Sequence, residues 1–395
     1  MKAVGKIFGL SLMLALCLTL LTGCGQRESV NEQAHDKSET VADTKEAEKA
    51  ATEEIAEDEE DYTPGYGDTF TDDAQKASAD TENADGAEEE DSEPEDNQES
   101  DAKEEVDEHL VDLIFFMGQS NMSGCGGDAS LAPKVAEDKG YEYRSVSDPT
   151  RLYPITEPFG INENRIGGLM EYPEGKKGSI VSAFINEYYE LTKRKVVAVS
   201  ISKGETSISD FLEPAVMDDV KQRYTYSKSY LSNNGYNIGH IYVVWLQGES
   251  DALEGTDPEV YKTKLDDFFR PMFIEGLEKV FFITPGRTYD YKNIYRPIIN
   301  VQKQISRESG YYAMATTVLG GVSTEYMTDM YHYNQHVLNL VGIESAKSIA
   351  YYTENGRKKI VYDYFEKENL VPDGIDEAAE IADEPLDLSK INDMY

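Results

Sequence analysis

Five short apolar runs, separated by stretches with helical periodicity, constrain the fold of this chain most strongly. The runs are rich in Val, Ile and aromatic residues, are bounded by turn residues, and lie at 111–118, 195–202, 240–248, 279–286 and 311–319. Helical patterns lie between or after them, at 178–194, 257–276, 294–309 and 336–352. Strands that are apolar on both faces and alternate with helices are typical of layered α/β proteins. We therefore expect an α/β fold with a mostly parallel sheet.

Polar residues or glycine stand just past the ends of the first three runs. Ser120 follows "VDLIFFMG", Gly204 follows "KVVAVSIS", and Gln247 lies at the end of "HIYVVWLQG". Parallel sheets bind their ligands outside the carboxyl ends of the strands, so we expect these residues to meet at one edge. Gly118 gives the backbone the freedom for a tight turn that lifts Ser120 out of this edge.

The first residues have the pattern of an export signal. Two lysines precede a long apolar run that ends Leu21-Thr22-Gly23-Cys24, as in secretion signals. The ending resembles the lipobox of bacterial lipoproteins. That resemblance implies that residues 1–23 are removed and that a lipid on Cys24 anchors the protein at the extracellular face of the bacterial cell membrane. An uncleaved apolar anchor and an ordinary signal peptide are the alternatives, and both also predict export.

Residues 24–108 differ sharply in composition from the rest of the chain. From 27 to 108 there are 33 Asp and Glu but only six Lys and Arg, a net charge of −27 out of −39. Such a segment repels itself and buries little, so we expect an extended, disordered stalk, with a binding tail as the alternative. The acidic balance argues against nucleic-acid partners. Residues 109–365 are numerous enough to form a domain with its own core, and the acidic residues 366–395 are expected to form a loosely docked or disordered tail.

A serine becomes a nucleophile when a base, usually a histidine held by a carboxylate, takes its proton. Three of the five histidines lie in the acidic segment or at strand entries, at the opposite edge of the sheet: His35, His109 and His240. His332 and His336 remain as candidate bases. Asp329 precedes His332 by three residues, so one loop could carry both, with the carboxylate accepting the Nδ1–H while Nε2 faces the serine.

Three motifs occur in a fixed order along the chain: "GQSN" after the first strand, "WLQGESDA" after the third and "DMYH" before the last helix. With this order and spread, most of residues 110–352 resembles the SGNH hydrolase superfamily. Within it, the chain resembles the sialate O-acetylesterase-like group and carbohydrate esterase family six. The resemblance implies a three-layer α/β/α sandwich of SGNH/flavodoxin-like type. It also implies Ser-His-Asp hydrolysis of O-acetyl esters on sugars, without a metal or organic cofactor.

The resemblance also implies residue roles. Ser120 is the nucleophile, His332 the base and Asp329 its orienting carboxylate. The N–H of Ser120, an N–H near Gly204 and the side chain of Gln247 match the positions that bind the oxyanion. Removal of one such donor typically lowers the rate by about 10²–10³.

Neighbouring residues are expected to support this site. Gln119 and Asn121 belong to the first motif, and Asn121 is expected to form the turn. Glu249 is expected to orient its loop, with a second carboxylate near the histidine as the alternative. Tyr331 and Tyr333, which flank His332, could stack on a sugar ring.

The chain departs from the family pattern at the second strand end. The family commonly shows two glycines and a small residue there, followed by a Trp, whereas this chain has Gly204-Glu205-Thr206 and Phe211. This leaves open which backbone N–H serves the oxyanion hole and what forms the substrate-binding wall. Met122 replaces the second glycine of G-x-S-x-G, which excludes the elbow of α/β-hydrolases. Cys125, the one cysteine outside the expected signal and lipid site, is expected to be a small packed residue rather than a catalytic thiol.

These observations predict an extracellular, surface-anchored carbohydrate O-acetylesterase that forms an acyl-enzyme on Ser120. We expect a monomer whose partners are an acetylated carbohydrate and, through Cys24, the membrane. A non-catalytic glycan-binding lipoprotein and an O-acetyltransferase with the same triad are the alternatives. Retention of all three triad candidates favours the enzyme, and a transferase would need an acceptor sugar that outcompetes water. The motifs do not specify which acetylated glycan is the substrate.

Overall fold

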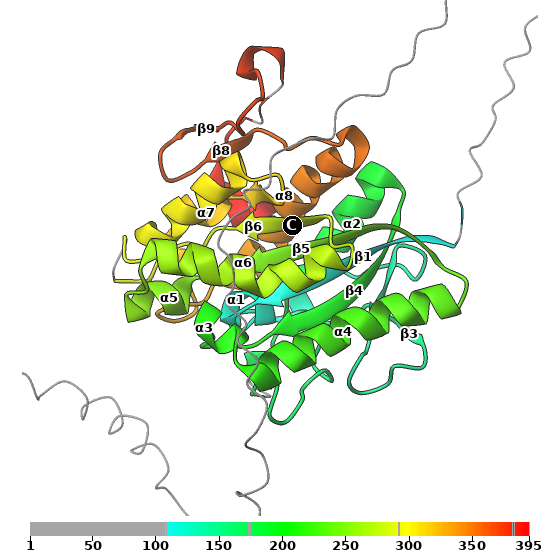
Figure 1. Ribbon diagram of the computed structural model, residues 1–395. Helices are drawn as coiled ribbons and strands as arrows, with labels where there is room; N and C mark the ends of the chain where they lie inside the picture. The colour runs from blue at the N-terminus through cyan, green and yellow to red at the C-terminus, as the bar shows by residue number, and fades with distance from the viewer. Residues whose placement is uncertain are drawn as a thin grey trace, which may run out of the picture. The chain divides into compact units, whose positions relative to one another are not determined.

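The computed structural model describes Asp107 and residues 109–394, except 173–174, 291–292, 381 and 383 (Figure 1). The expected signal sequence, the lipid site Cys24 and, apart from Asp107, the acidic stalk lie outside the described residues. Among the residues that the structure describes, no helix is both long enough and apolar enough to cross a membrane.

A seven-stranded sheet forms the centre of the described part of the chain. In spatial order its strands are β3 (Leu152–Pro154), β2 (Gly140–Tyr143), β4 (Lys195–Ser202), β1 (Leu110–Gly118), β5 (Asn237–Leu246), β6 (Lys279–Ile283) and β7 (Tyr312–Thr316). Neighbouring strands pair in parallel, except that β3 runs antiparallel to β2 at the edge. The expected α/β fold with a mostly parallel sheet is therefore confirmed. Without β2 and β3, the chain order of the strands across the sheet is second-first-third-fourth-fifth, the flavodoxin-like order.

The predicted strands correspond to β1, β4, β5, β6 and β7. Alternate side chains of each strand enter separate cores on the two faces of the sheet, as Phe115 and Phe116 of β1 do. This double burial explains why the strands read as continuous apolar runs. Strand β7 is shorter than predicted, because the chain turns into a 3₁₀ helix at Val318–Gly320.

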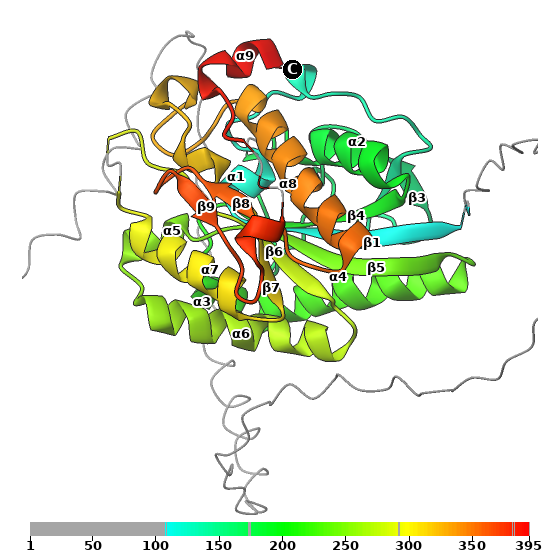
Figure 2. The same cartoon turned by 90° about the horizontal axis from the view of Figure 1, so that it is seen from above.

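Helices cover both faces of the sheet. Helices α4 (Pro214–Asn233), α6 (Pro258–Ile274) and α7 (Arg296–Glu308) contribute to one core, and α2 (Val181–Thr192) and α8 (Gln335–Asn355) to the other. Figure 2 shows α2 and α8 on one side of the strands and α4 and α6 on the other. The structure thus has the expected three α/β/α layers.

Helix α4 was not predicted, because its buried face is partly polar. Asp219 and Arg223, one helical turn apart, are almost completely buried and form an ion pair at 2.9 Å. Arg223 also donates to the carbonyl oxygens of Ser200 and Glu163, at 3.0 and 2.8 Å. Two charges on the core side interrupt the apolar periodicity from which a helix is normally recognised.

The C-terminal residues pack on the domain. Strands β8 (Val361–Asp363) and β9 (Glu368–Leu370) form an antiparallel hairpin, and Ile391 at the start of α9 (Ile391–Met394) is fully buried in the core that includes α8. The boundary expected after residue 365 therefore falls inside a hairpin. The described part of 366–394 is docked rather than loose, because a few apolar residues among the acidic ones, such as Leu370, reach the core.

The remaining elements are short. They are α1 (Ser120–Ser123), α3 (Ile208–Phe211), α5 (Glu249–Glu254) and 3₁₀ helices at Ala129–Leu131, Thr324–Tyr326, Glu377–Ala379 and Leu388–Lys390.

Candidate active site

The carboxyl ends of three central strands lie in register. Gly118 of β1 pairs with Ser202 of β4 on one side and Leu246 of β5 on the other. Just beyond this row, the chain leaves the sheet at three of the expected site residues: Ser120, Gly204 and Gln247. Their expected convergence on one edge is therefore observed.

The turn that carries Ser120 depends on Gly118. The φ angle of Gly118 is 150°, and a Cβ at this position would lie 2.0 Å from the carbonyl oxygen of Leu246. Only glycine permits so close an approach. The N–H of Gln119 donates to the same carbonyl oxygen at 3.0 Å. Ser120 then begins the short helix α1 and is 9% exposed; as a first-turn residue, its N–H has no acceptor within the helix.

Gln119 braces this turn against the end of β5. Its side-chain oxygen accepts the N–H groups of Gly248 and Ser250, at 3.3 and 3.2 Å. The backbone of Gln119 and its side chain thus both bind the β5 strand end, which fixes the direction in which the chain enters α1.

Asp329 and His332 form a pair within one tight loop. Oδ2 of Asp329 lies 2.7 Å from Nδ1 of His332, and Oδ1 accepts the N–H groups of Tyr331 and His332 at 2.8 and 2.9 Å. Burial alone would raise the pKa of Asp329, but the hydrogen bonds from His332 and Tyr331 outweigh it, and the pKa is lowered. The carboxylate is therefore ionised at neutral pH and orients the imidazole.

Asn121 connects the Ser120 turn to this loop. Its side-chain nitrogen donates to Oε1 of Glu249 at 2.9 Å and to the carbonyl oxygen of Tyr331 at 3.2 Å. Its side-chain oxygen accepts the N–H of Tyr333 at 3.3 Å. Because residues 331 and 333 flank His332, one buried side chain next to Ser120 fixes the backbone on both sides of the histidine. Asn121 was expected only to form the turn, and it does more than that.

Glu249 is the carboxylate that accepts the Asn121 side chain. Its side chain is 3% exposed, and its Oε2 atom has no hydrogen-bond partner among the described residues. Burial raises its pKa, although the hydrogen bond from Asn121 and the nearby His332 act in the opposite direction. The hydrogen bond from Asn121 fits the orienting role, and the position of Glu249 near His332 also fits the alternative of a second carboxylate near the histidine.

Two of the three expected oxyanion donors are occupied in this structure. The backbone N–H of Gly204 donates to the carboxylate of Glu171. The Gln247 side chain is fully buried, and its nitrogen donates to the carbonyl oxygen of Thr206 and to Asp251. Gln247 thus braces the loops after β4 and β5, and the N–H of Ser120 is the expected donor that remains.

The departures from the family pattern have clear structural counterparts. Glu205, which stands where the family commonly has a glycine, has a φ of 55°. Glu205 therefore adopts the left-handed backbone conformation that glycine favours. Phe211 is fully buried, with its ring centroid 5.1 Å from that of Trp245 and 5.3 Å from that of Phe268. It belongs to the core and forms no wall of the site.

The loop between β3 and α2 supplies residues that sequence reasoning missed. Glu171, which accepts the N–H of Gly204, and Lys176 are each 5% exposed. The Nζ of Lys176 donates to Ser202 Oγ at 3.0 Å. Burial lowers the pKa of Lys176 to about 8, although Glu171 opposes this shift. Cys125 donates to the carbonyl oxygen of Gly175 at 2.9 Å, and burial raises its pKa to about 12. It is a packed, protonated thiol, as expected.

The structure also separates the remaining candidates near His332. Tyr333 is 1% exposed and its hydroxyl accepts the N–H of Arg287 at 2.9 Å, so it cannot stack on a ligand. Tyr331 is 39% exposed. His336 lies in the first turn of α8, and its Nδ1 has no hydrogen-bond partner in the described part of the chain. Of the two candidate bases, only His332 is paired with a carboxylate in these residues.

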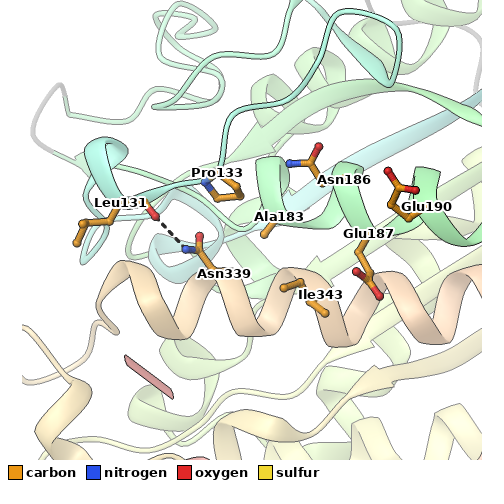
Figure 3. A pocket seen from close by; sticks show the side chains of 8 residues that line it. All are labelled: Leu131, Pro133, Ala183, Asn186, Glu187, Glu190, Asn339 and Ile343. Carbon is orange, nitrogen blue, oxygen red and sulfur yellow. Dashed lines mark hydrogen bonds between the residues drawn. The ribbon is translucent and has the colours of Figure 1, made fainter. Parts of the chain in front are cut away.

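A separate cavity lies between α2 and α8 (Figure 3). Its volume is about 310 Å³, and its lining includes Leu131, Pro133, Ala183 and Ile343. The Asn339 side chain donates to the carbonyl oxygen of Leu131 at 3.0 Å at one end. No residue of the expected site lines this cavity.

The fold and this edge of the sheet define the class of the protein. A parallel α/β sheet that carries a serine turn and an Asp-His pair at its carboxyl edge is an arrangement suited to ester hydrolysis. Residues 111–350 match the family described as carbohydrate esterase, sialic acid-specific acetylesterase. This span is more than half of the chain, and the chain belongs to this family of ester hydrolases. The resemblance to sialate O-acetylesterases is thereby confirmed.

Three solved structures are similar to the chain. A protein from Arabidopsis thaliana is 18% identical with a TM-score of 0.46, over 62% of this chain and 98% of that one. A carbohydrate acetylesterase from Xanthomonas citri is 12% identical with a TM-score of 0.39, over 62% and 57%. A lipase/acylhydrolase from Enterococcus faecalis is 12% identical with a TM-score of 0.32, over 61% and 95%. No curated protein sequence matches the chain.

Proposed function

We propose that this protein removes acetyl groups from carbohydrates through an acyl-enzyme on Ser120. The observation that carries the proposal is the Asp329–His332 pair, with 2.7 Å between Oδ2 and Nδ1. An imidazole held through Nδ1 keeps Nε2 for the serine hydroxyl. Asn121, next to Ser120, forms hydrogen bonds with the backbone on both sides of His332, which supports the proposal that Ser120 and His332 lie close together.

In the proposed reaction, Nε2 of His332 takes the proton of the Ser120 hydroxyl while Oγ attacks the acetyl carbonyl carbon. The tetrahedral intermediate collapses with cleavage of the ester C–O bond, and the sugar hydroxyl leaves with the proton from His332. Water then attacks the acetyl-serine with His332 again acting as base, which releases acetate. Asp329 remains ionised and stabilises the imidazolium in both steps.

In the proposed oxyanion hole, one donor is the backbone N–H of Ser120. We assign the second donor to the N–H of Gly204 once the Glu171 carboxylate has moved off it. Gln247 supports the hole indirectly through the loops that it braces. This assignment differs from the sequence expectation because the amide of Gln247 already has two acceptors.

The proposed location is the extracellular face of the membrane. It is supported by the sequence alone: an apolar start that ends in a lipobox-like Leu21-Thr22-Gly23-Cys24, followed by an acidic segment. A lipid on Cys24 and a long acidic stalk would let the esterase domain reach glycans away from the membrane.

Acetate release tests this proposal. The substrates are 4-nitrophenyl acetate, acetylated xylo-oligosaccharide and O-acetylated sialic acid, each given to the wild type and to Ser120→Ala. Release from an acetylated sugar that disappears in Ser120→Ala is the expected result. Folded wild-type protein that releases no acetate from either acetylated sugar would overturn the proposal.

A further inference from the structure

Two exposed tyrosines belong to chain segments that meet at the His332 loop. Tyr331 is 39% exposed and Tyr289 is 52% exposed, whereas neighbouring Tyr333 is buried. An aromatic ring offers a large apolar face, and exposed tyrosines at the edge of a site are suited to binding a partly apolar ligand.

Both tyrosines are fixed to the same part of the site. The backbone N–H of Tyr289 donates to the carbonyl oxygen of Met330 at 3.0 Å, which joins the segment after β6 to the His332 loop. The Tyr331 ring meets the His332 imidazole edge-on, with 6.3 Å between the centroids. The Tyr331 ring therefore contacts the proposed base, and the backbone of Tyr289 is bonded to the loop that carries it.

The backbone that carries them is well anchored. Thr288, before Tyr289, is fully buried, and the N–H of Arg287 donates to the buried Tyr333 hydroxyl at 2.9 Å. The carbonyl oxygen of Tyr331 accepts from Asn121 at 3.2 Å. A ligand that packs on these rings would need to order little of the protein, which favours binding.

We infer that Tyr289 and Tyr331 form an aromatic platform that binds a pyranose ring of an acetylated oligosaccharide beside His332. The inference rests on the proposed function and names its substrate class. The C–H face of a sugar ring packs on an aromatic face while the sugar hydroxyls stay in water. A small acetyl ester lacks such a ring, so the platform selects oligosaccharide over small esters.

The test compares two substrates in single variants of the full chain. Tyr289→Ala and Tyr331→Ala remove the rings, and Tyr289→Phe and Tyr331→Phe keep them. Tyr311→Ala is the matched control: Tyr311 is 54% exposed but precedes the amino end of β7, at the opposite edge of the sheet. KM and kcat are measured for acetylated xylo-oligosaccharide and for 4-nitrophenyl acetate.

Each alanine variant is expected to raise KM for the oligosaccharide about three- to tenfold, as loss of one aromatic contact typically does. The phenylalanine variants and Tyr311→Ala should stay within about twofold of the wild type. On 4-nitrophenyl acetate, which carries no sugar ring, the alanine variants should lose less than on the oligosaccharide and Tyr311→Ala should keep the wild-type rate. Far-UV circular dichroism shows that all variants are folded. Unchanged KM for the oligosaccharide in both alanine variants would overturn the platform and leave the esterase proposal intact. If the wild type cleaves the small ester but no acetylated sugar, the proposed function itself fails.

Discussion

Asp329 holds His332 through two separate bonds. One carboxylate oxygen lies 2.7 Å from Nδ1 of the ring, and the other accepts the backbone N–H of the same histidine at 2.9 Å. The three-residue spacing thus lets a single side chain shape the loop and orient the imidazole. This dual contact makes the loop, rather than the histidine alone, the unit that the proposed chemistry depends on.

Substitutions in this pair should differ in severity. We expect His332→Ala to abolish measurable hydrolysis of 4-nitrophenyl acetate. Asp329→Asn should lower kcat by about 10²–10⁴, because an amide no longer stabilises the imidazolium or the correct tautomer. Steady-state kinetics check both. His336→Ala, four residues further on, is the control and should remain active. Full activity of His332→Ala with loss in His336→Ala would show that the base had been assigned wrongly.

Asn121→Ala should uncouple the Ser120 turn from the histidine loop. We expect kcat to fall about 10–100-fold with little change in KM, since misplacement of the base by a fraction of an ångström weakens proton transfer more than binding. Asn186→Ala removes a half-buried side chain that lies away from the expected site and donates to the carbonyl oxygen of Lys134, and it serves as the control. Equal kinetics of the two variants would contradict a positioning role for Asn121.

Glu171→Gln tests the occupation of the Gly204 N–H. A hydrogen bond to a charged acceptor is roughly twice as strong as one to a neutral acceptor. The neutral amide should therefore release the donor more readily and raise kcat on 4-nitrophenyl acetate several-fold. Glu205→Gln removes a neighbouring exposed charge and should have no such effect. A large fall in kcat for Glu171→Gln would mean that Glu171 supports the site instead of occupying its donor.

Because Lys176 is buried, we expect the free energy of unfolding to depend on pH. Burial lowers its pKa to about 8 in the folded protein, against about 10.4 in an unfolded chain. Between these values the unfolded chain binds more protons, so the contribution of Lys176 to the free energy of unfolding rises with pH. It is fully present above about pH 10.4 and is lost as the pH falls through about 8.

Denaturant titrations at pH 7 and pH 10 measure this effect. The wild type should gain stability relative to Lys176→Met by on the order of 2 kcal/mol between the two pH values. Lys177→Met, which changes the exposed neighbour, should show no pH-dependent difference. If the free energy of unfolding changes equally between pH 7 and pH 10 in the wild type and in Lys176→Met, the lowered pKa of Lys176 is contradicted.

Sequence predicts those strands and helices whose buried side chains are nearly all apolar. Strand β1 lies between two cores. All residues from Val111 to Met117 are buried, and all but Asp112 are apolar. Helix α4 lacks such uniformity because the Asp219–Arg223 ion pair occupies its buried face. The docking of residues 366–394 depends on isolated apolar residues such as Ile391, which no local pattern distinguishes.

The site divides in the same way. Ser120, Asp329 and His332 are proposed from two short motifs far apart in the sequence, and the three-residue spacing of Asp329 and His332 lets one loop carry both. Glu171 is not, because it reaches Gly204 from a loop 33 residues earlier in the sequence, and only the tertiary fold brings the two together. The contacts of Gln247 with Thr206 and Asp251 are likewise tertiary, so its availability as a donor could not be judged from sequence.

The most direct test of the account is to look for the acetyl-enzyme itself. The protein is mixed with 4-nitrophenyl acetate, quenched in acid within the first turnovers, digested and analysed by mass spectrometry. We predict an acetyl group on Ser120 that is absent from Ser120→Ala, together with loss of hydrolysis in that variant. Sustained hydrolysis by Ser120→Ala, with no acetyl group on Ser120 of the wild type, would contradict the central claim.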